Sequence, residues 1–144
     1  AHEKHYLDFY GNVGSIIMGR KTYEEVLGFG VDWPYANVDC YIATRKAGYA
    51  TSTPQTKVLS SLSKEVIQEI EESHDGNLWI VGGGEVVAQL WNNDLIDEWI
   101  IAVIPVILGE GLPLFKEGLR ENWLSLEKVE TFDSGAVCLT YRRA

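Results

Sequence analysis

Residues 78–92 read LWIVGGGEVVAQLWN, and three consecutive glycines separate an apolar run from a stretch with helical spacing. Residues 78–81 are apolar at every position, which is typical of a central strand covered on both faces. Apolar residues then recur from Val86 to Trp91 at the spacing of one helix face. Glycine loses more conformational entropy on folding than any other residue, and a simple turn needs only one. We therefore expect another group to come very close to this backbone.

The same order of strand, turn and helix occurs earlier in the chain. An apolar strand over residues 13–18 is followed by GRKTYEEVL, whose apolar residues lie on one side of a helix. Further strands are predicted at 38–44 and 57–59, and a helix over roughly 64–73 begins after Ser63, a plausible N-cap. Alternating strands and helices predict a largely parallel sheet.

The last third of the sequence changes to strands alone. Residues 98–108 form an apolar run interrupted by Pro105, which lacks a ladder donor and indicates a bulge or a sheet edge. Strands over 123–131 and 136–142 flank a short turn that forces an antiparallel hairpin. We expect one α/β domain over residues 1–144, with a mostly parallel mixed sheet that ends in this hairpin.

Composition limits the classes of partner. The 144 residues are 46% apolar and carry a formal charge of −9, which argues against nucleic-acid or anionic-membrane partners and favours small molecules. No apolar run reaches the length of a membrane span of about 18 residues and no signal peptide opens the chain, so a cytoplasmic protein is expected. Cys40 and Cys138 lack metal-site spacing and are interpreted as buried free thiols.

Three turns offer groups that bind phosphate. Free amides at the triple glycine would converge with a helix dipole, although close packing of the helix on its strand explains three glycines equally well. The dinucleotide motif G-x-G-x-x-G is not met, because Val87 occupies the third glycine position. Gly19-Arg20-Lys21-Thr22 and Thr44-Arg45-Lys46 follow two other strands; a solvated turn with basic residues is the alternative for the first.

Parallel strands end on the same side of a sheet, so all three turns should face one cleft. An extended ligand with several phosphates fits such a cleft, with pyrophosphate between two helix starts and a further phosphate bound by arginine. NADPH has this chemistry.

At this point the motifs IIMGRKTYE, WIVGGGEV and ILGEGLPLF, together with the strand that ends in Thr44-Arg45, resemble the dihydrofolate reductase superfamily. The resemblance covers about residues 6–142 and is closest to the branch that contains the reductase domain of the bifunctional riboflavin-biosynthesis deaminase/reductase. It implies a three-layer α-β-α fold. The family's opening strand and loop are absent from this sequence, which begins AHEKHYLDFYG.

The resemblance also implies the residues that bind NADPH. One set would bind its phosphates (Gly19, Arg20, Lys21 and Thr22), one would lie beside the adenosine ribose and its 2′-phosphate (Thr44 and Arg45), and one would wrap the pyrophosphate (Gly82, Gly83, Gly84, Glu85 and Val86). In the folate enzymes two of these glycines are joined by a cis peptide, which we expect at Gly82-Gly83. The ILGEGLPLF run would shape the substrate end and lie near a dimer contact.

The proton donor is the weakest part of the resemblance. The ungapped register from Arg20 places Glu3 where the folate enzymes have their acidic residue, but water could also supply the proton. His2 and His5 are expected in a frayed N-terminus. Tyr6 and Phe9 are expected in the core or a pocket wall, and Trp33 either caps a flat heterocycle or packs on the surface.

The resulting hypothesis is an NADPH-dependent reductase that transfers hydride to a flat nitrogen heterocycle or a related carbonyl or imine, without an attached deaminase, because the zinc signature of that domain is missing. The alternatives are a nucleotide-binding module without turnover and a true dihydrofolate reductase. The apolar run at 100–108 favours a homodimer.

Overall fold

The computed structural model describes residues 2–144, with side chains from Lys4 onward. Four helices and seven strands are assigned within these described residues, in the order α1 (His2–Tyr10), β1 (Val13–Gly19), α2 (Arg20–Leu27), β2 (Asp39–Ala43), β3 (Thr56–Leu59), α3 (Lys64–Glu72), β4 (Asn77–Gly82), α4 (Gly84–Asn92), β5 (Glu98–Val103), β6 (Leu124–Thr131) and β7 (Val137–Arg143).

The strands and helices predicted from residue 13 onward agree with these bounds, with one difference of length, whereas α1 is a helix that the sequence analysis does not predict. The strand predicted over 98–108 ends at Val103, two residues before Pro105, and the chain continues as an irregular segment to β6. Proline removes a ladder hydrogen bond, which is the physical reason to end pairing here. The predicted N-cap of α3 is confirmed, because the Ser63 side chain accepts a hydrogen bond from the Val66 amide.

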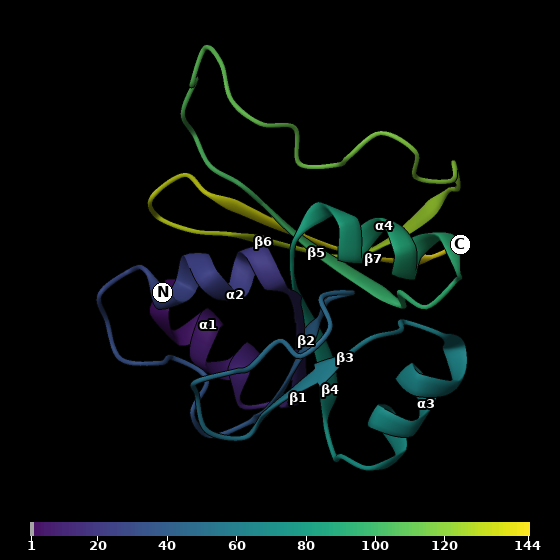
Figure 1. The fold of residues 1–144 in the computed structure, drawn as a ribbon. Helices are drawn as coiled ribbons and strands as arrows, with labels where there is room; N and C mark the ends of the chain where they lie inside the picture. The colour runs from purple at the N-terminus through teal and green to yellow at the C-terminus, as the bar shows by residue number, and fades with distance from the viewer. Residues whose placement is uncertain (1) are drawn as a thin grey trace.

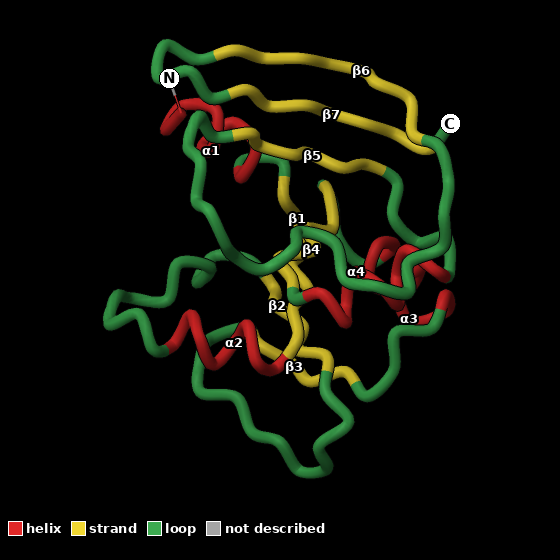
Figure 2. The backbone as a smooth tube through the Cα atoms, turned by 90° about the horizontal axis from the view of Figure 1, so that it is seen from above, coloured by secondary structure: helices red, strands yellow, loops and turns green. Residues whose placement is uncertain are grey.

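The predicted α/β class is confirmed, but the strands within residues 2–144 form two separate sheets and not the one mixed sheet that we expect from the sequence. One is a parallel sheet in the order β3-β2-β1-β4, and the other is an antiparallel sheet in the order β5-β7-β6. Figure 2 shows the antiparallel sheet at the top and the parallel sheet below it. The expected hairpin is the β6–β7 pair, whose register runs from Leu124↔Arg143 to Thr131↔Val137.

Helices cover both faces of the parallel sheet. Helices α1 and α2 lie on one side of it, and α3 and α4 lie on the other (Figure 1). Alternate residues of β1 divide between the two cores: Ile17 packs with α3 and α4, whereas Ile16 and Met18 pack with Tyr23 of α2. All four side chains are buried, as expected for β1, which is an interior strand of the parallel sheet.

A histidine side chain connects the end of α3 to the parallel sheet. The ring of His74, just after α3, contacts the Ile70 carbonyl through Nδ1 and the Asp39 carboxylate through Nε2, each at 2.7 Å. These contacts tie the end of α3 to the start of β2.

Cys40 is buried as expected, and burial raises the pKa of its thiol to about 12. Cys138 is also a free thiol but is only half-buried.

Candidate functional site

The turns after β1, β2 and β4 open into one cleft with a volume of about 940 Å³. This is the convergence that the sequence predicts. The lining residues include Gly19, Arg20, Lys21, Thr22, Thr44, Arg45, Gly83, Gly84, Glu85 and Val86. The cleft lies at the carboxyl edge of a parallel sheet, where ligands of open α/β folds bind.

Two helices begin at this cleft without a side-chain cap. Gly19 is the N-cap of α2 and Gly83 is the N-cap of α4, and neither supplies a side-chain hydrogen bond to the first turn. The first amides of a helix lack intrahelical partners and carry the positive end of the helix dipole. Both helix starts therefore present donors that suit the oxygens of an anion.

Close neighbours and backbone conformation explain why glycine occupies these two turns. A Cβ built on Gly83 would lie 3.2 Å from Oγ1 of Thr22, and one on Gly19 would lie 3.3 Å from Cγ2 of Val86. Gly82 has a φ of +143°, which L side chains rarely adopt. The expected cis peptide at Gly82-Gly83 is confirmed. Gly82 itself is not among the lining residues and ends β4 just behind Thr22.

The first cationic turn already holds an internal partner. Nη1 of Arg20 lies 2.9 Å from Oε1 of Glu24 one helical turn later. The other oxygen of this carboxylate accepts a hydrogen bond from the Tyr49 hydroxyl, also at 2.9 Å. The Tyr49 hydrogen bond, followed by Arg20, lowers the pKa of Glu24, so this carboxylate is ionised at neutral pH. An incoming phosphate would therefore share Arg20 with Glu24.

The second cationic turn is shaped by Thr44. Its amide donates to the Leu59 carbonyl at 3.0 Å, which aligns the ends of β2 and β3. Its hydroxyl accepts from the Lys46 amide at 3.1 Å, which bends the chain away from the sheet. Arg45, between these two residues, is exposed on the cleft wall.

Hydroxyl groups after β3 were missed by the sequence analysis. Ser60, Ser61 and Ser63 line the same cleft. They follow the third strand as the other motifs follow the first two, so the rule that parallel strands end at one edge could have found them. For Ser63 the sequence analysis predicts only the role of a helix cap. Hydroxyl groups beside cations can both donate to and accept from a phosphate or a ribose.

A lysine from a distant loop also reaches the site. Lys116, in the segment between β5 and β6, forms an ion pair with Glu85 in the first turn of α4. Its Cβ lies 3.5 Å from a Cβ built on Gly84. Lys116, more than Arg45 and Lys21, lowers the pKa of Glu85. Residue 116 lies far from the glycines in the sequence, and no local pattern links them.

The expected N-terminal residues have different outcomes. Glu3, the proposed proton donor, and His2 have side chains outside the described residues. The expectation that His5 lies in a frayed end is wrong: it is part of α1, where its Nε2 lies 3.3 Å from the Glu130 carboxylate. It also makes an edge-to-face contact with the Phe132 ring. Helix α1 is therefore held against the β6–β7 hairpin.

The aromatic side chains near α1 pack with one another. Phe9 makes an edge-to-face contact with Trp79 of β4, as expected of a core or pocket-wall residue. The same expectation is wrong for Tyr6, which is 44% exposed, although its ring contacts Trp79. Trp33 packs edge-to-face against Tyr23 and Tyr35. Packing, the second of the two expectations for Trp33, is what the structure shows.

Comparison with known proteins places these features in a family. The family model of the RibD C-terminal domain matches residues 36–138. The uncharacterized protein YwjB of Bacillus subtilis strain 168 is 37% identical over 139 residues, which cover 96% of this chain and 79% of YwjB. The uncharacterized protein YyaP of the same organism is 24% identical over 145 residues, which cover 94% of this chain and 77% of YyaP.

Two solved structures share the fold. A protein from Shewanella sp. PV-4 assigned to riboflavin biosynthesis superposes with a TM-score of 0.81 at 27% identity, over 96% of this chain and 78% of that one. Dihydrofolate reductase from Enterococcus faecalis, in complex with NADP(H), has a TM-score of 0.69 at 19% identity, over 97% of this chain and 82% of that one.

Proposed function

The chain belongs to the RibD C-terminal domain family, and on this premise we propose that it is an NADPH-dependent reductase. The single observation that carries the proposal is the cleft where four strand ends meet. Two helices begin there without a side-chain cap, at Gly19 and Gly83, and the turns after β2 and β3 add cationic and hydroxyl side chains. Few ligands other than a dinucleotide with a further phosphate use all of these groups at once.

We assign the phosphates to the two helix starts and their neighbours. The amides after Gly19 and Gly83 would bind the pyrophosphate, because both N-termini carry partial positive charge and no side chain blocks the approach. Arg45 would bind the 2′-phosphate of the adenosine ribose, together with Ser60 and Ser61, which line the same cleft after the neighbouring strand. The fold likeness to a dihydrofolate reductase that binds NADP(H) supports this choice of cofactor.

NADPH supplies the hydride when it is bound, and the protein's contribution is to hold its nicotinamide against the acceptor. The acceptor that we propose is a flat nitrogen heterocycle, or a related carbonyl or imine. The relationship to a structure assigned to riboflavin biosynthesis supports a substrate related to that pathway's heterocycles. Glu3 is the proposed proton donor, and solvent water is the other source.

Binding and turnover are tested separately. Isothermal titration with NADPH and NADH measures whether the cleft binds a dinucleotide and whether it prefers the 2′-phosphate. A panel of pterins and pyrimidine heterocycles is then offered with NADPH, and its oxidation is followed by absorbance. Binding without oxidation of NADPH would identify a nucleotide-binding module, and turnover of dihydrofolate would identify a dihydrofolate reductase. Failure to bind NADPH would refute both the enzyme and the binding module.

We also propose that the protein is a homodimer. Large apolar side chains are exposed on the segment between β5 and β6 and on β6 itself, namely Ile104, Val106, Ile107, Leu108, Leu112, Leu114, Trp123, Leu126 and Val129. Exposed apolar groups of this number mark interaction surfaces in many proteins. Sedimentation velocity would show the dimer, and Ile107→Glu should shift it to a monomer.

None of the helices described in residues 2–144 is long and apolar enough to cross a bilayer.

A further inference from the structure

Lys116 brings a positive charge to the start of α4, next to the amides that we assign to the pyrophosphate. It forms an ion pair with Glu85, which is the second residue of this helix and part of the cleft lining. Its Cβ lies 3.5 Å from a Cβ built on Gly84, so its side chain begins against the first residue of the helix. Lys116 therefore stands beside the cleft, although it belongs to the segment between β5 and β6.

The first amides of α4 are open to an anion. The first backbone hydrogen bond of the helix runs from the Val87 amide to the Gly83 carbonyl, at 3.1 Å. The amides of Gly84, Glu85 and Val86 therefore have no acceptor within the helix. A pyrophosphate on these donors would lie beside the Glu85 carboxylate, which is ionised at neutral pH because Lys116 lowers its pKa. The two negative groups would repel each other unless a cation lay between them.

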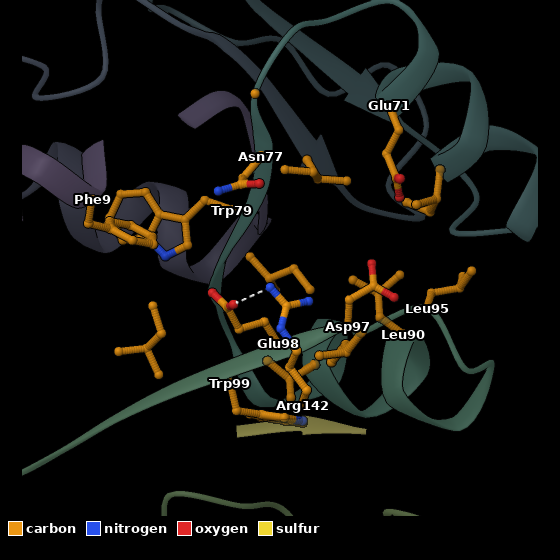
Figure 3. A pocket seen from close by; sticks show the side chains of 17 residues that line it. Phe9, Glu71, Asn77, Trp79, Leu90, Leu95, Asp97, Glu98, Trp99 and Arg142 are labelled. Carbon is orange, nitrogen blue, oxygen red and sulfur yellow. Dashed lines mark hydrogen bonds and ion pairs between the residues drawn. The ribbon is translucent and has the colours of Figure 1, made fainter. Parts of the chain in front are cut away.

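An aromatic contact holds the segment just before Lys116. Phe115 meets the ring of Trp99 edge to face, with 5.3 Å between the ring centroids. Trp99 extends from β5, as Figure 3 shows, and its ring also packs against Trp91 of α4. Phe115 is therefore held against the strand and, through Trp99, against the helix at which the pyrophosphate would bind.

Hydrogen bonds hold the segment just after Lys116. The Asn92 side chain, at the end of α4, donates to the Gly118 carbonyl at 3.0 Å and accepts from the Arg120 amide at 2.7 Å. The Trp91 indole donates to the Arg120 carbonyl at 2.6 Å. Lys116 thus lies between two fixed points of the segment, and a group that is already held in place loses less conformational entropy when it binds a ligand.

We propose that Lys116 is a further binding residue for the pyrophosphate of the dinucleotide, and that Glu85 positions its ammonium group. This inference rests on the proposed function. An ammonium group has three donors, and among the described residues the Lys116 ammonium donates only to Glu85. The remaining donors are open to phosphate oxygens. The lysine would lie between the carboxylate and the pyrophosphate and bind both.

The simpler alternative is a surface ion pair that has no ligand. The two side chains are exposed, and exposed pairs contribute little to stability. A glutamate in the first turn is already stabilised by the helix dipole, so α4 does not need a lysine from a distant segment. An anion that binds beside this glutamate does need one. The position of the pair at the cleft therefore favours the role in binding.

Isothermal titration of Lys116→Ala with NADPH and NADH tests the inference. Both dinucleotides contain the pyrophosphate, so both Kd values should rise by about tenfold, as expected for the loss of one charge-assisted hydrogen bond. Lys116→Arg keeps the charge and the donors and should bind both within about threefold of the parent protein. Lys128→Ala breaks an ion pair with Glu130 outside the cleft lining and should leave both Kd values unchanged.

Two further measurements separate direct contact from indirect effects. In the Glu85→Gln background, Lys116→Ala should still raise both Kd values by about threefold or more, because the lysine contacts the phosphate itself. Hydrogen exchange of the Arg120 amide reports whether the segment stays on α4. It should be the same in Lys116→Ala and in the parent protein, because Asn92 and Trp91 hold the segment without Lys116.

Four results would overturn the inference. Unchanged Kd values in Lys116→Ala would refute it alone, because the parent protein would still bind the dinucleotide as the proposed function requires. Loss of the effect in the Glu85→Gln background would show that Lys116 only neutralises Glu85. Weaker binding together with faster exchange at Arg120 would show that Lys116 holds the segment in place. A parent protein that binds neither dinucleotide would refute the proposed function and this inference together.

Discussion

Replacing Arg45 with alanine should cost the protein its preference for NADPH over NADH. Arg45 is exposed on the cleft wall and, unlike Arg20, makes no ion-pair contact with a carboxylate among the described residues. Its charge acts on Glu85 more weakly than that of Lys116, so a phosphate can bind Arg45 without displacing a carboxylate. A hydrogen bond to a charged group contributes about 1.5–3 kcal/mol, and exposure to solvent reduces this. We therefore expect a loss of about 1.4 kcal/mol, which is about a tenfold higher Kd for NADPH.

The assay is isothermal titration of the parent protein and the variant with both dinucleotides. The Kd for NADH should stay unchanged, because NADH has no 2′-phosphate. Arg20→Ala is the informative comparison: Arg20 sits at the start of α2 and already pairs with Glu24, so its loss should weaken both dinucleotides alike if it contacts the pyrophosphate. Lys128→Ala, on β6, removes one positive charge from a residue that does not line the cleft and controls for net charge.

The reasoning would be refuted by an equal loss of NADPH and NADH affinity in the Arg45 variant. It would also be refuted if Lys128→Ala had the same effect as Arg45→Ala. Raising the salt concentration should reduce the difference between the parent protein and the Arg45 variant, because an exposed phosphate–arginine pair is screened by ions.

Two further predictions concern stability. A backbone hydrogen bond at the end of α3, followed by Asp39, raises the pKa of His74, so its stabilising contact is present at low pH. The free energy of unfolding should fall as pH rises from the ordinary value of 6.5 through the raised folded-state pKa, and His74→Gln should lose this dependence in urea unfolding. A Cβ on Gly14 would lie 1.6 Å from the Asp75 carbonyl oxygen, so Gly14→Ala should cost about 3 kcal/mol or more. Gly111→Ala, with no neighbour closer than 3.9 Å, should be nearly neutral in the same measurement.

Most of the fold follows from local patterns. Apolar runs with period two or with no interruption identified the strands, and helical spacing with a Ser63 cap identified α3 within a residue or so. The parallel order follows because helices connect successive strands. Proline explained why β5 ends at Val103 once the structure showed where pairing stops.

The cleft is partly predictable for the same reason. Turns after parallel strands share one edge, and this rule predicts from the sequence alone that Gly19, Thr44 and Gly83 lie together. It would also have found Ser60 and Ser61 had it been applied to the third strand. The rule predicts only that the turns lie at one edge of the sheet. The choice of an anionic ligand rests on the cationic side chains in these turns.

The sequence by itself determined the strands and helices from β1 onward, apart from the end of β5, and where the backbone needs glycine, because side-chain periodicity and backbone freedom are local properties. It did not determine α1, which is held in place by contacts with distant segments. Only the tertiary structure decided that Lys116 reaches Glu85 and that His74 reaches Asp39. These facts depend on how distant segments are placed in space, and no pattern of neighbouring residues specifies that placement.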